Sequence, residues 1–182
     1  KAPAKVNLSL LVGPRGRDGF HELFTVFAPI DLYDALDIKL EARPAGAIEG
    51  NLKVKCPVAE GDSNLTFNAL KILEKETEWV FEGRVEIEKH IPAGAGLGGG
   101  SSDAAIALLA GVQALIEADG PAPSRDRQIE LARDIGADVA FFLAPRPAIG
   151  RGIGEILEPI DLPELVLVLV LSDRRLSTER VY

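Results

Sequence analysis

A glycine-rich run at residues 92–102, Pro-Ala-Gly-Ala-Gly-Leu-Gly-Gly-Gly-Ser-Ser, most constrains what this chain can fold into. It follows a segment in which Val85 and Ile87 alternate with glutamates, which is typical of a strand, and it precedes an alanine- and leucine-rich segment at 104–118, which is typical of a helix. Glycines allow the backbone to approach a ligand closely, and a helix start carries a partial positive charge. We therefore predict that this run binds a phosphate group.

The spacing within the run limits which type of phosphate loop it can be. A Walker A loop needs a lysine directly before its final Ser or Thr, and Gly100 stands at that place. Residues 94–99 match the Gly-x-Gly-x-x-Gly fingerprint of dinucleotide-binding folds, which leaves an NAD-type oxidoreductase as an alternative. That fingerprint also requires an acidic residue at the end of a second strand, whereas Asp119 closes an expected helix. The dinucleotide match is therefore formal only.

Hydrophobic periodicity along the rest of the chain indicates an α+β domain. The expected strands and extended segments are residues 6–10, 20–30, 36–40, 85–88, a stretch near 148 and 165–171; the expected helices are residues 64–76, 104–118 and 126–135. The longest uninterrupted apolar run, at 165–171, suits a buried strand and is far shorter than a membrane span. We expect a mixed, mostly antiparallel sheet packed by helices.

Composition and charge narrow the function classes. Apolar residues make up 47% of the chain and charged residues 26%, which excludes a disordered polypeptide. The formal net charge of −8 argues against a nucleic-acid partner, which a basic face would normally bind. The only cysteine, Cys56, excludes an intramolecular disulfide and fits a reducing compartment. Because the chain begins at Lys1 and contains no methionine, we expect its natural start to lie upstream.

Two further residue types fit phosphoryl transfer to an alcohol. Lys5 lies on the polar face of the first expected strand beside Asn7, and taken alone it would be interpreted as a solvated edge charge. Asp138 stands between an expected helix and an apolar segment, where capping a turn is an equal alternative. In phosphoryl transfer, a carboxylate accepts the hydroxyl proton, and a lysine stabilises developing charge. The sequence alone does not show whether the two side chains meet.

The segment Asp18-Gly19-Phe20-His21 combines a loop with an aromatic ring and an imidazole, which can pack against and hydrogen-bond a nucleobase. A core phenylalanine and a surface histidine are the favoured alternative for these residues on their own. The acidic residues are scattered, and this indicates a solvated surface. His90 and Cys56 have no partners at metal-ligand spacing.

Four segments stand together in an order and spacing that resemble the GHMP kinase superfamily: residues 4–8, 18–22, 91–105 and 136–139. Within it, the chain is similar to the branch that phosphorylates the 2-hydroxyl of 4-diphosphocytidyl-2-C-methyl-D-erythritol in non-mevalonate isoprenoid biosynthesis. The resemblance implies the superfamily's amino-terminal fold with a left-handed βαβ unit. It also implies an ATP-binding domain at residues 1–160 and, at 161–182, the start of a link to a carboxyl-terminal domain that we expect to be missing from this sequence.

The resemblance also implies roles for individual residues. Lys5 and Asp138 match the catalytic positions, with Asp138 as the base. The positions implied for ATP are Asn64, Lys89, Pro92, Ala93, Gly94, Ala95, Gly96, Leu97, Gly98, Gly99, Gly100, Ser101 and Ser102. The positions implied for the cytidine-bearing substrate are Asn7, Phe20, His21, Thr178 and Tyr182, with the rings of Phe20 and Tyr182 on either side of the cytosine. The family usually has tyrosine at position 20 and proline at position 140, where this chain has Phe20 and Ala140.

The cofactors implied are ATP and Mg²⁺, and Ser101 and Ser102 are the metal-ligand candidates nearest to the expected phosphates. Two other functions stay open: a GHMP kinase for homoserine, mevalonate or a sugar, and a nucleotide-binding module without catalysis. We expect a small-molecule substrate, no nucleic-acid or membrane partner and a cytoplasmic location. The sequence does not indicate an oligomeric state.

Overall fold

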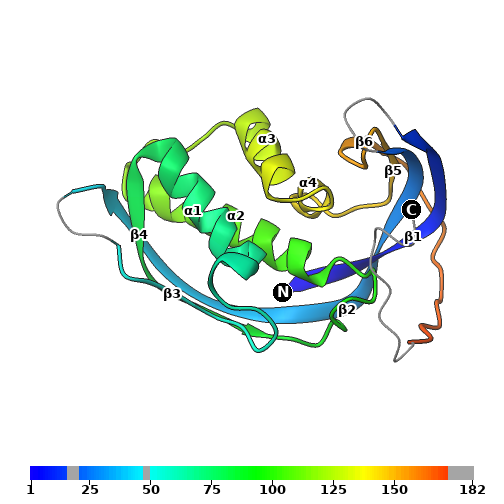
Figure 1. Cartoon of the computed structure of the whole chain (residues 1–182), viewed down its shortest axis with the longest axis horizontal. Coiled ribbons are helices and arrows are strands. Elements are labelled where there is room, and N and C mark those ends of the chain that lie inside the picture. Colours follow the sequence, from blue (N-terminus) through cyan, green and yellow to red (C-terminus); the bar gives the residue numbers. More distant parts are fainter. Residues whose placement is uncertain (16–20, 47–49, 172–182) are drawn as a thin grey trace.

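One long, curved strand organises the fold of the computed structural model, which describes residues 1–15, 21–46 and 50–171. This strand, β2 (His21–Pro44), pairs antiparallel with β1 (Ala2–Arg15) and with β5 (Ala148–Arg151) through its first half, and with β4 (Trp79–Glu88) through its second half (Figure 1). Two short strands extend the sheet: β3 (Leu52–Lys55) is parallel to β4, and β6 (Ile156–Pro159) is antiparallel to β5.

The expected mixed, mostly antiparallel sheet is confirmed, because β3–β4 is the one parallel pair among the described residues. Sequence periodicity divided β2 into two strands at 20–30 and 36–40, but the structure joins them into one. The chain stays extended through Asp34, although the register against β1 shifts between Pro3 and Ala4. The β3–α1–β4 unit is the parallel crossover, and its left-handedness stays a prediction.

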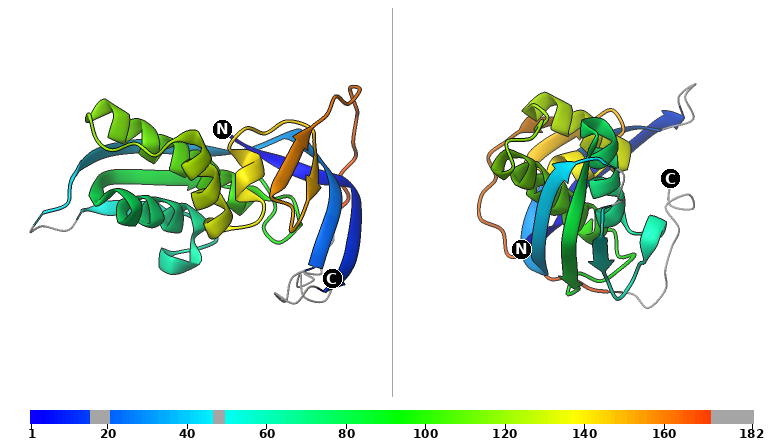
Figure 2. Two further views of the ribbon diagram at one scale, coloured as in Figure 1. Left: turned by 90° about the horizontal axis from the view of Figure 1, so that it is seen from above. Right: turned by 90° about the vertical axis from the view of Figure 1, so that its left-hand side faces the viewer.

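The helices lie together on the concave face of the sheet (Figures 1 and 2). They are α1 (Leu65–Thr77), α2 (Gly99–Glu117), α3 (Arg125–Ile135) and the short α4 (Val139–Phe142); a 3-10 turn, η1 (Gly61–Ser63), precedes α1. The expected helix at 104–118 begins earlier, at Gly99, because the last glycines of the loop already form its first turn.

The core lies between α2 and the sheet. Leu108 and Leu115 of α2 are fully buried, and so are Leu73 of α1 and Phe81 of β4. By length and composition alone, α2 could cross a membrane, but 56% of that stretch is buried inside the fold. Such burial is typical of a helix in the core of a folded domain.

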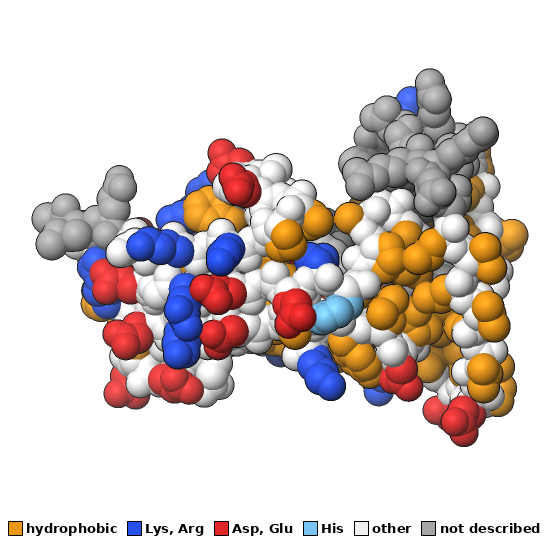
Figure 3. All heavy atoms as spheres, turned by 90° about the horizontal axis from the view of Figure 1, so that it is seen from below, with side chains coloured by type: hydrophobic (Ala, Val, Ile, Leu, Met, Phe, Trp, Pro, Cys, Tyr) orange, Lys and Arg blue, Asp and Glu red, His pale blue; other side chains and the backbone are white. Residues whose placement is uncertain are grey.

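The segment at 165–171 corrects an expectation, since it is neither a strand nor buried. Val166, Val168 and Val170 are 95%, 86% and 90% exposed. The leucines that alternate with these valines border a hollow of about 360 Å³ beside residues 28–32 of β2. The segment therefore turns its leucines toward the protein and its valines toward solvent. A strand needs a hydrogen-bonded neighbour, and the described residues place none there. Figure 3 shows hydrophobic side chains gathered over the end of the molecule where this segment and β1 lie.

The regular elements of the described residues end at Pro159. The division into a domain at 1–160 and a link from 161 onward stays a prediction.

Candidate active site

The glycine-rich loop has the backbone geometry of an anion-binding nest. Gly94, Gly96 and Gly98 have φ angles of 76°, 74° and 72°, and the residues between them keep negative φ values. Alternation of this kind turns successive N–H groups toward one concavity, where an anion can bind. Residues other than glycine rarely adopt such positive φ angles, which explains why glycine occupies every second position of this loop.

A cleft of about 520 Å³ lies along this loop. The loop lines it from Ile91 to Ser101, and the opposite wall comes from the segment before α1, including Val58 and Asn64. Two charged side chains, Lys89 and Asp103, also border it. The positive end of α2, whose first residue is Gly99, therefore faces a space of suitable size for several phosphate groups.

The loop is tied to β1 at Lys5. The backbone N–H of Lys5 donates to the carbonyl oxygen of Leu97 at 2.9 Å. A Cβ atom added at Gly98 would lie 2.8 Å from the ring of Phe142 and 3.2 Å from Cγ of Lys5. The loop, β1 and α4 thus meet at one point, and only glycine fits between them at position 98.

Lys5 and Asp138 form an ion pair at this meeting point. The Lys5 Nζ lies 3.3 Å from the Asp138 Oδ2, and the two side chains are 7% and 30% exposed. Asp138 occupies the residue before α4 but makes no side-chain capping hydrogen bond. Its carboxylate is therefore partly open to solvent and held beside a buried lysine, so it is accessible to the proton of an incoming hydroxyl.

A chain of hydrogen bonds continues from Lys5 into β2. Lys5 Nζ donates to Asn7 Oδ1 at 2.6 Å, and Asn7 Nδ2 donates to Thr25 Oγ1 at 2.7 Å. Thr25 Oγ1 in turn donates to the carbonyl oxygen of Ser9 at 2.7 Å. Lys5 Nζ also lies over the ring of Phe27, 5.3 Å from its centroid.

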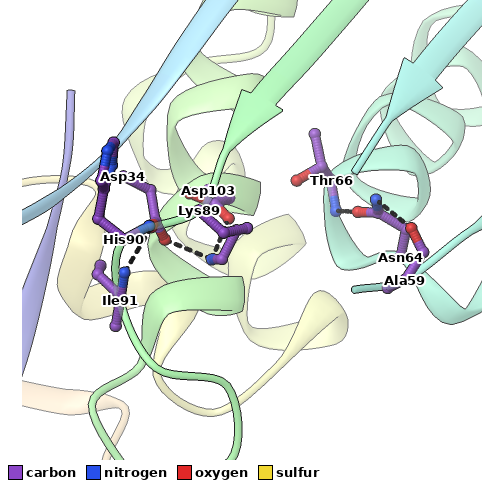
Figure 4. Close-up of polar contacts among 8 residues, drawn as sticks. All are labelled: Asp34, Ala59, Asn64, Thr66, Lys89, His90, Ile91 and Asp103. Carbon is purple, nitrogen blue, oxygen red and sulfur yellow. Dashed lines mark hydrogen bonds and ion pairs between the residues drawn. The ribbon is translucent and has the colours of Figure 1, made fainter. Parts of the chain in front are cut away.

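A buried ionic network of Asp34, Lys89 and Asp103 lies next to the start of the glycine-rich loop (Figure 4). Lys89 Nζ donates to Asp34 and, at 2.7 Å, to Asp103 Oδ2. The second Asp34 oxygen accepts the backbone N–H groups of His90 and Ile91 at 2.6 and 2.8 Å. Asp34 thus holds the strand exit from which the glycine-rich loop begins.

Comparison with known proteins agrees with this geometry. The family model "GHMP kinases N terminal domain" matches residues 64–145, which include the glycine-rich loop and Asp138. Residues 64–145 thus have the sequence pattern of a GHMP kinase N-terminal domain.

Proteins similar to this chain are named 4-diphosphocytidyl-2-C-methyl-D-erythritol kinase. A protein of Thermus thermophilus is 42% identical over 181 residues, which is 100% of this chain and 60% of the relative. That of Anaeromyxobacter sp. strain K is 43% identical over 93% of this chain and 52% of its own length. The chain thus spans about 60% or less of the length of these relatives.

The crystal structure of a 4-(cytidine 5'-diphospho)-2C-methyl-D-erythritol kinase aligns with a TM-score of 0.65 and 44% identity. The alignment covers 89% of this chain and 55% of that one. A mevalonate diphosphate decarboxylase from Legionella pneumophila, 17% identical with a TM-score of 0.53, shares the fold. The amino-terminal GHMP fold expected from the sequence is therefore confirmed.

Most of the expected ATP positions line the cleft, but the side chains of Asn64 and Lys89 are engaged in other hydrogen bonds, and Ser102 lies off the cleft. The Asn64 side chain caps α1, because its Oδ1 accepts the Thr66 N–H at 2.9 Å while its Nδ2 donates to Ala59 (Figure 4). Ser102 is fully buried and does not border the cleft, whereas Ser101 does. Of the two serines, only Ser101 is placed to meet a phosphate or a metal ion.

The expected substrate positions are more widely spread. Asn7 lies beside Lys5, but His21 begins β2 six residues before Phe27, roughly 20 Å along the strand. The His21 ring nitrogen Nδ1 contacts the Gly13 carbonyl oxygen at 2.9 Å. Phe20, Thr178 and Tyr182 lie outside the described residues.

Sequence reasoning missed Asp34 and Asp103, because it treated the acidic residues as a solvated surface. Their side chains are 0% and 3% exposed. A signal was present in their neighbours: Asp103 opens an alanine-rich segment, and Asp34 lies within a long extended stretch rich in apolar residues. A carboxylate at such a position is buried and needs a cationic partner.

Burial shifts the pKa values of Lys89 and Asp103 in opposite directions, because it disfavours the charged form of each group. Burial raises the pKa of the Asp103 carboxyl to about 6, although the hydrogen bond and charge of Lys89 act to lower it. Burial would lower the pKa of Lys89, but the hydrogen bonds and charges of Asp103 and Asp34 outweigh this and raise it. Within the described structure, the Asp103 Oδ1 is buried and has no hydrogen-bond partner.

The raised pKa of Asp103 predicts a pH-dependent stability. The folded state holds this proton up to a pH of about 6, whereas the unfolded chain releases it near the ordinary value of 3.8. Folding is therefore favoured by this group below pH 3.8, and the contribution is lost as the pH rises through 6. Between about pH 5 and about pH 7.5 the loss is on the order of 1 kcal/mol.

Urea unfolding of the wild type and of Asp103→Asn measures this contribution. The difference in unfolding free energy between them should shift in favour of the variant by about 1 kcal/mol from pH 5 to pH 7.5. Asp37→Asn is the matched control, since the Asp37 side chain is 56% exposed. An Asp103→Asn difference that is the same at both pH values would contradict the assignment.

Proposed function

We propose that the protein transfers the γ-phosphoryl group of ATP to the 2-hydroxyl of 4-diphosphocytidyl-2-C-methyl-D-erythritol. The observation that carries this proposal is the Lys5–Asp138 ion pair at 3.3 Å, in direct contact with the glycine nest through Gly98. The names of the relatives with about 42% identity support the choice of substrate.

The chemistry follows from the charges at this point. Asp138 accepts the hydroxyl proton, and the freed oxygen forms a bond to the γ-phosphorus while the bond to the β-phosphate oxygen breaks and ADP leaves. Lys5 holds the Asp138 carboxylate in place through their ion pair and neutralises charge that develops on the transferred group. The N–H groups of the loop at 94–98 and the start of α2 hold the remaining phosphates.

Mg²⁺ is expected to bind together with ATP, and the described residues offer few ligands for it. Among residues 1–15, 21–46 and 50–171, no group of three or more His, Cys, Asp or Glu side chains could hold a metal ion. Mg²⁺ at kinase sites is bound mainly by phosphates and waters with one or two protein oxygens. The Ser101 hydroxyl would supply one such oxygen beside the cleft. The bound ion would neutralise phosphate charge.

The distance between the expected substrate positions Asn7 and His21 supports a long substrate. In the proposed acceptor, the cytosine and the reacting hydroxyl lie at opposite ends, with a diphosphate between them. His21 lies roughly 20 Å along β2 from Phe27, which itself packs beside Lys5. Homoserine and mevalonate are too short to span that distance.

A coupled assay of ADP release tests the proposal. We expect turnover with Mg-ATP and the cytidylyl substrate by the full-length protein, measured in parallel with the 182-residue chain. CDP should compete with the acceptor, whereas homoserine, mevalonate and sugars should not be phosphorylated. Absence of both turnover and CDP binding would reject this substrate, and ATP binding without turnover on any alcohol would favour a non-catalytic module. The cytoplasmic location stays a prediction.

A further inference from the structure

Thr25 lies at the far end of the hydrogen-bond chain that begins at Lys5. It is fully buried, and its hydroxyl both donates to the Ser9 carbonyl and accepts from Asn7 Nδ2, each at 2.7 Å. The hydroxyl thus uses its one proton and one of its two lone pairs on partners from β1. No role in the proposed reaction follows for Thr25 from its own position, because Asn7 lies between it and Lys5.

A β-bulge brings the two partners to Thr25. Asn7 pairs with Phe27, and Ser9 pairs with Val26, so Leu8 is an extra residue in β1 at this point. A bulge bends its strand and redirects neighbouring groups. Here it lets the Ser9 carbonyl and the Asn7 side chain reach the same hydroxyl.

The direction of each hydrogen bond is fixed by what each group can do. The Ser9 carbonyl can only accept, so the single hydroxyl proton of Thr25 points to it. The hydroxyl can then only accept from Asn7, which forces the amide nitrogen of Asn7 toward Thr25. The amide oxygen of Asn7 must therefore face Lys5, whose ammonium group can only donate.

We infer that Thr25 is a positioning residue that orients the Asn7 amide and, through it, holds Lys5 against Asp138. A lysine side chain is long and flexible, so one ion pair would leave its Nζ free to swing. The Asn7 oxygen at 2.6 Å and the Asp138 oxygen at 3.3 Å restrict it from two sides. If the amide turned over, its NH₂ group would face the ammonium group and repel it.

Two substitutions separate positioning from packing. Thr25→Val keeps the shape of the side chain but removes the hydroxyl, whereas Thr25→Ser keeps the hydroxyl but removes a methyl group from a buried site. Both should lower the thermal midpoint, one through unpaired polar groups and the other through a small cavity. A purely structural role would therefore make the two variants alike in function.

The catalytic readout rests on the proposed function. In the ADP-release assay with the full-length protein, Thr25→Val should lower kcat roughly tenfold with little change in KM for ATP, as expected for the loss of about one oriented hydrogen bond. Thr25→Ser should stay within about twofold of the wild-type kcat. Equal kcat values for the two variants would overturn the inference.

A second readout does not depend on any activity. Acetylation of Lys5, followed by peptide mass spectrometry, reports how firmly its amine is held. The labelling rate should rise roughly tenfold in Thr25→Val and stay near the wild-type rate in Thr25→Ser. An unchanged rate in Thr25→Val would overturn the inference even in an active enzyme. If no variant or wild-type protein releases ADP, the proposed function fails and the labelling rates alone decide the role of Thr25.

Discussion

Replacing Asp138 by asparagine should lower kcat by roughly 10²–10⁴-fold in the full-length protein while leaving the fold intact. Asparagine has the same size but cannot accept the proton of the attacking hydroxyl. The fold should tolerate the change because the Asp138 side chain is 30% exposed and makes no capping hydrogen bond to α4. Steady-state ADP release together with thermal unfolding measures both effects.

Asp134→Asn is a suitable control, because Asp134 is an exposed aspartate of α3 close to Asp138 in sequence. Its kcat should stay near that of the wild type. KM for ATP should change little in Asp138→Asn, since the phosphates contact the loop rather than this carboxylate in the proposed mechanism. A near-normal kcat for Asp138→Asn would remove Asp138 from the role of base, whatever the behaviour of the control.

The glycine-rich loop could be predicted as a phosphate site from the residues themselves. Its flanking strand and helix patterns are clear, and the nest geometry follows from glycine at positions 94, 96 and 98. The α+β class was equally accessible, because alternation and helical spacing are local properties of the chain. The run at 165–171 shows the limit of this reasoning: alternation identifies an extended backbone but not whether another strand pairs with it.

The Lys5–Asp138 contact was beyond local patterns. The residues alone favoured a solvated charge for Lys5, and only the family resemblance placed it in the site, whereas the structure leaves it 6% exposed. Asp34 and Asp103 were missed altogether, because each is separated from Lys89 along the chain and becomes its neighbour only when β2, β4 and α2 assemble. Such ionic contacts depend on tertiary packing, which neither charge counts nor periodicity report.

The Asp34–Lys89–Asp103 network predicts the largest effect on stability. Asp34→Ala should lower the free energy of unfolding by about 3–5 kcal/mol, because it removes one partner of a buried ion pair. The loss leaves the backbone N–H groups of His90 and Ile91 without their acceptor and leaves Lys89 with Asp103 as its remaining carboxylate among the described residues.

Asp34→Asn separates the two contributions to that loss. Asparagine keeps an oxygen that can accept from the backbone of residues 90 and 91 but gives up the charge beside Lys89, so its loss should be smaller than that of alanine. Asp31→Ala, an exposed change in the same strand, should cost less than about 1 kcal/mol. Urea unfolding followed by circular dichroism compares the three variants. An Asp34→Ala loss as small as that of Asp31→Ala would mean that the network contributes little to the fold, and that the loop is held by its contacts with Lys5 and Phe142 instead.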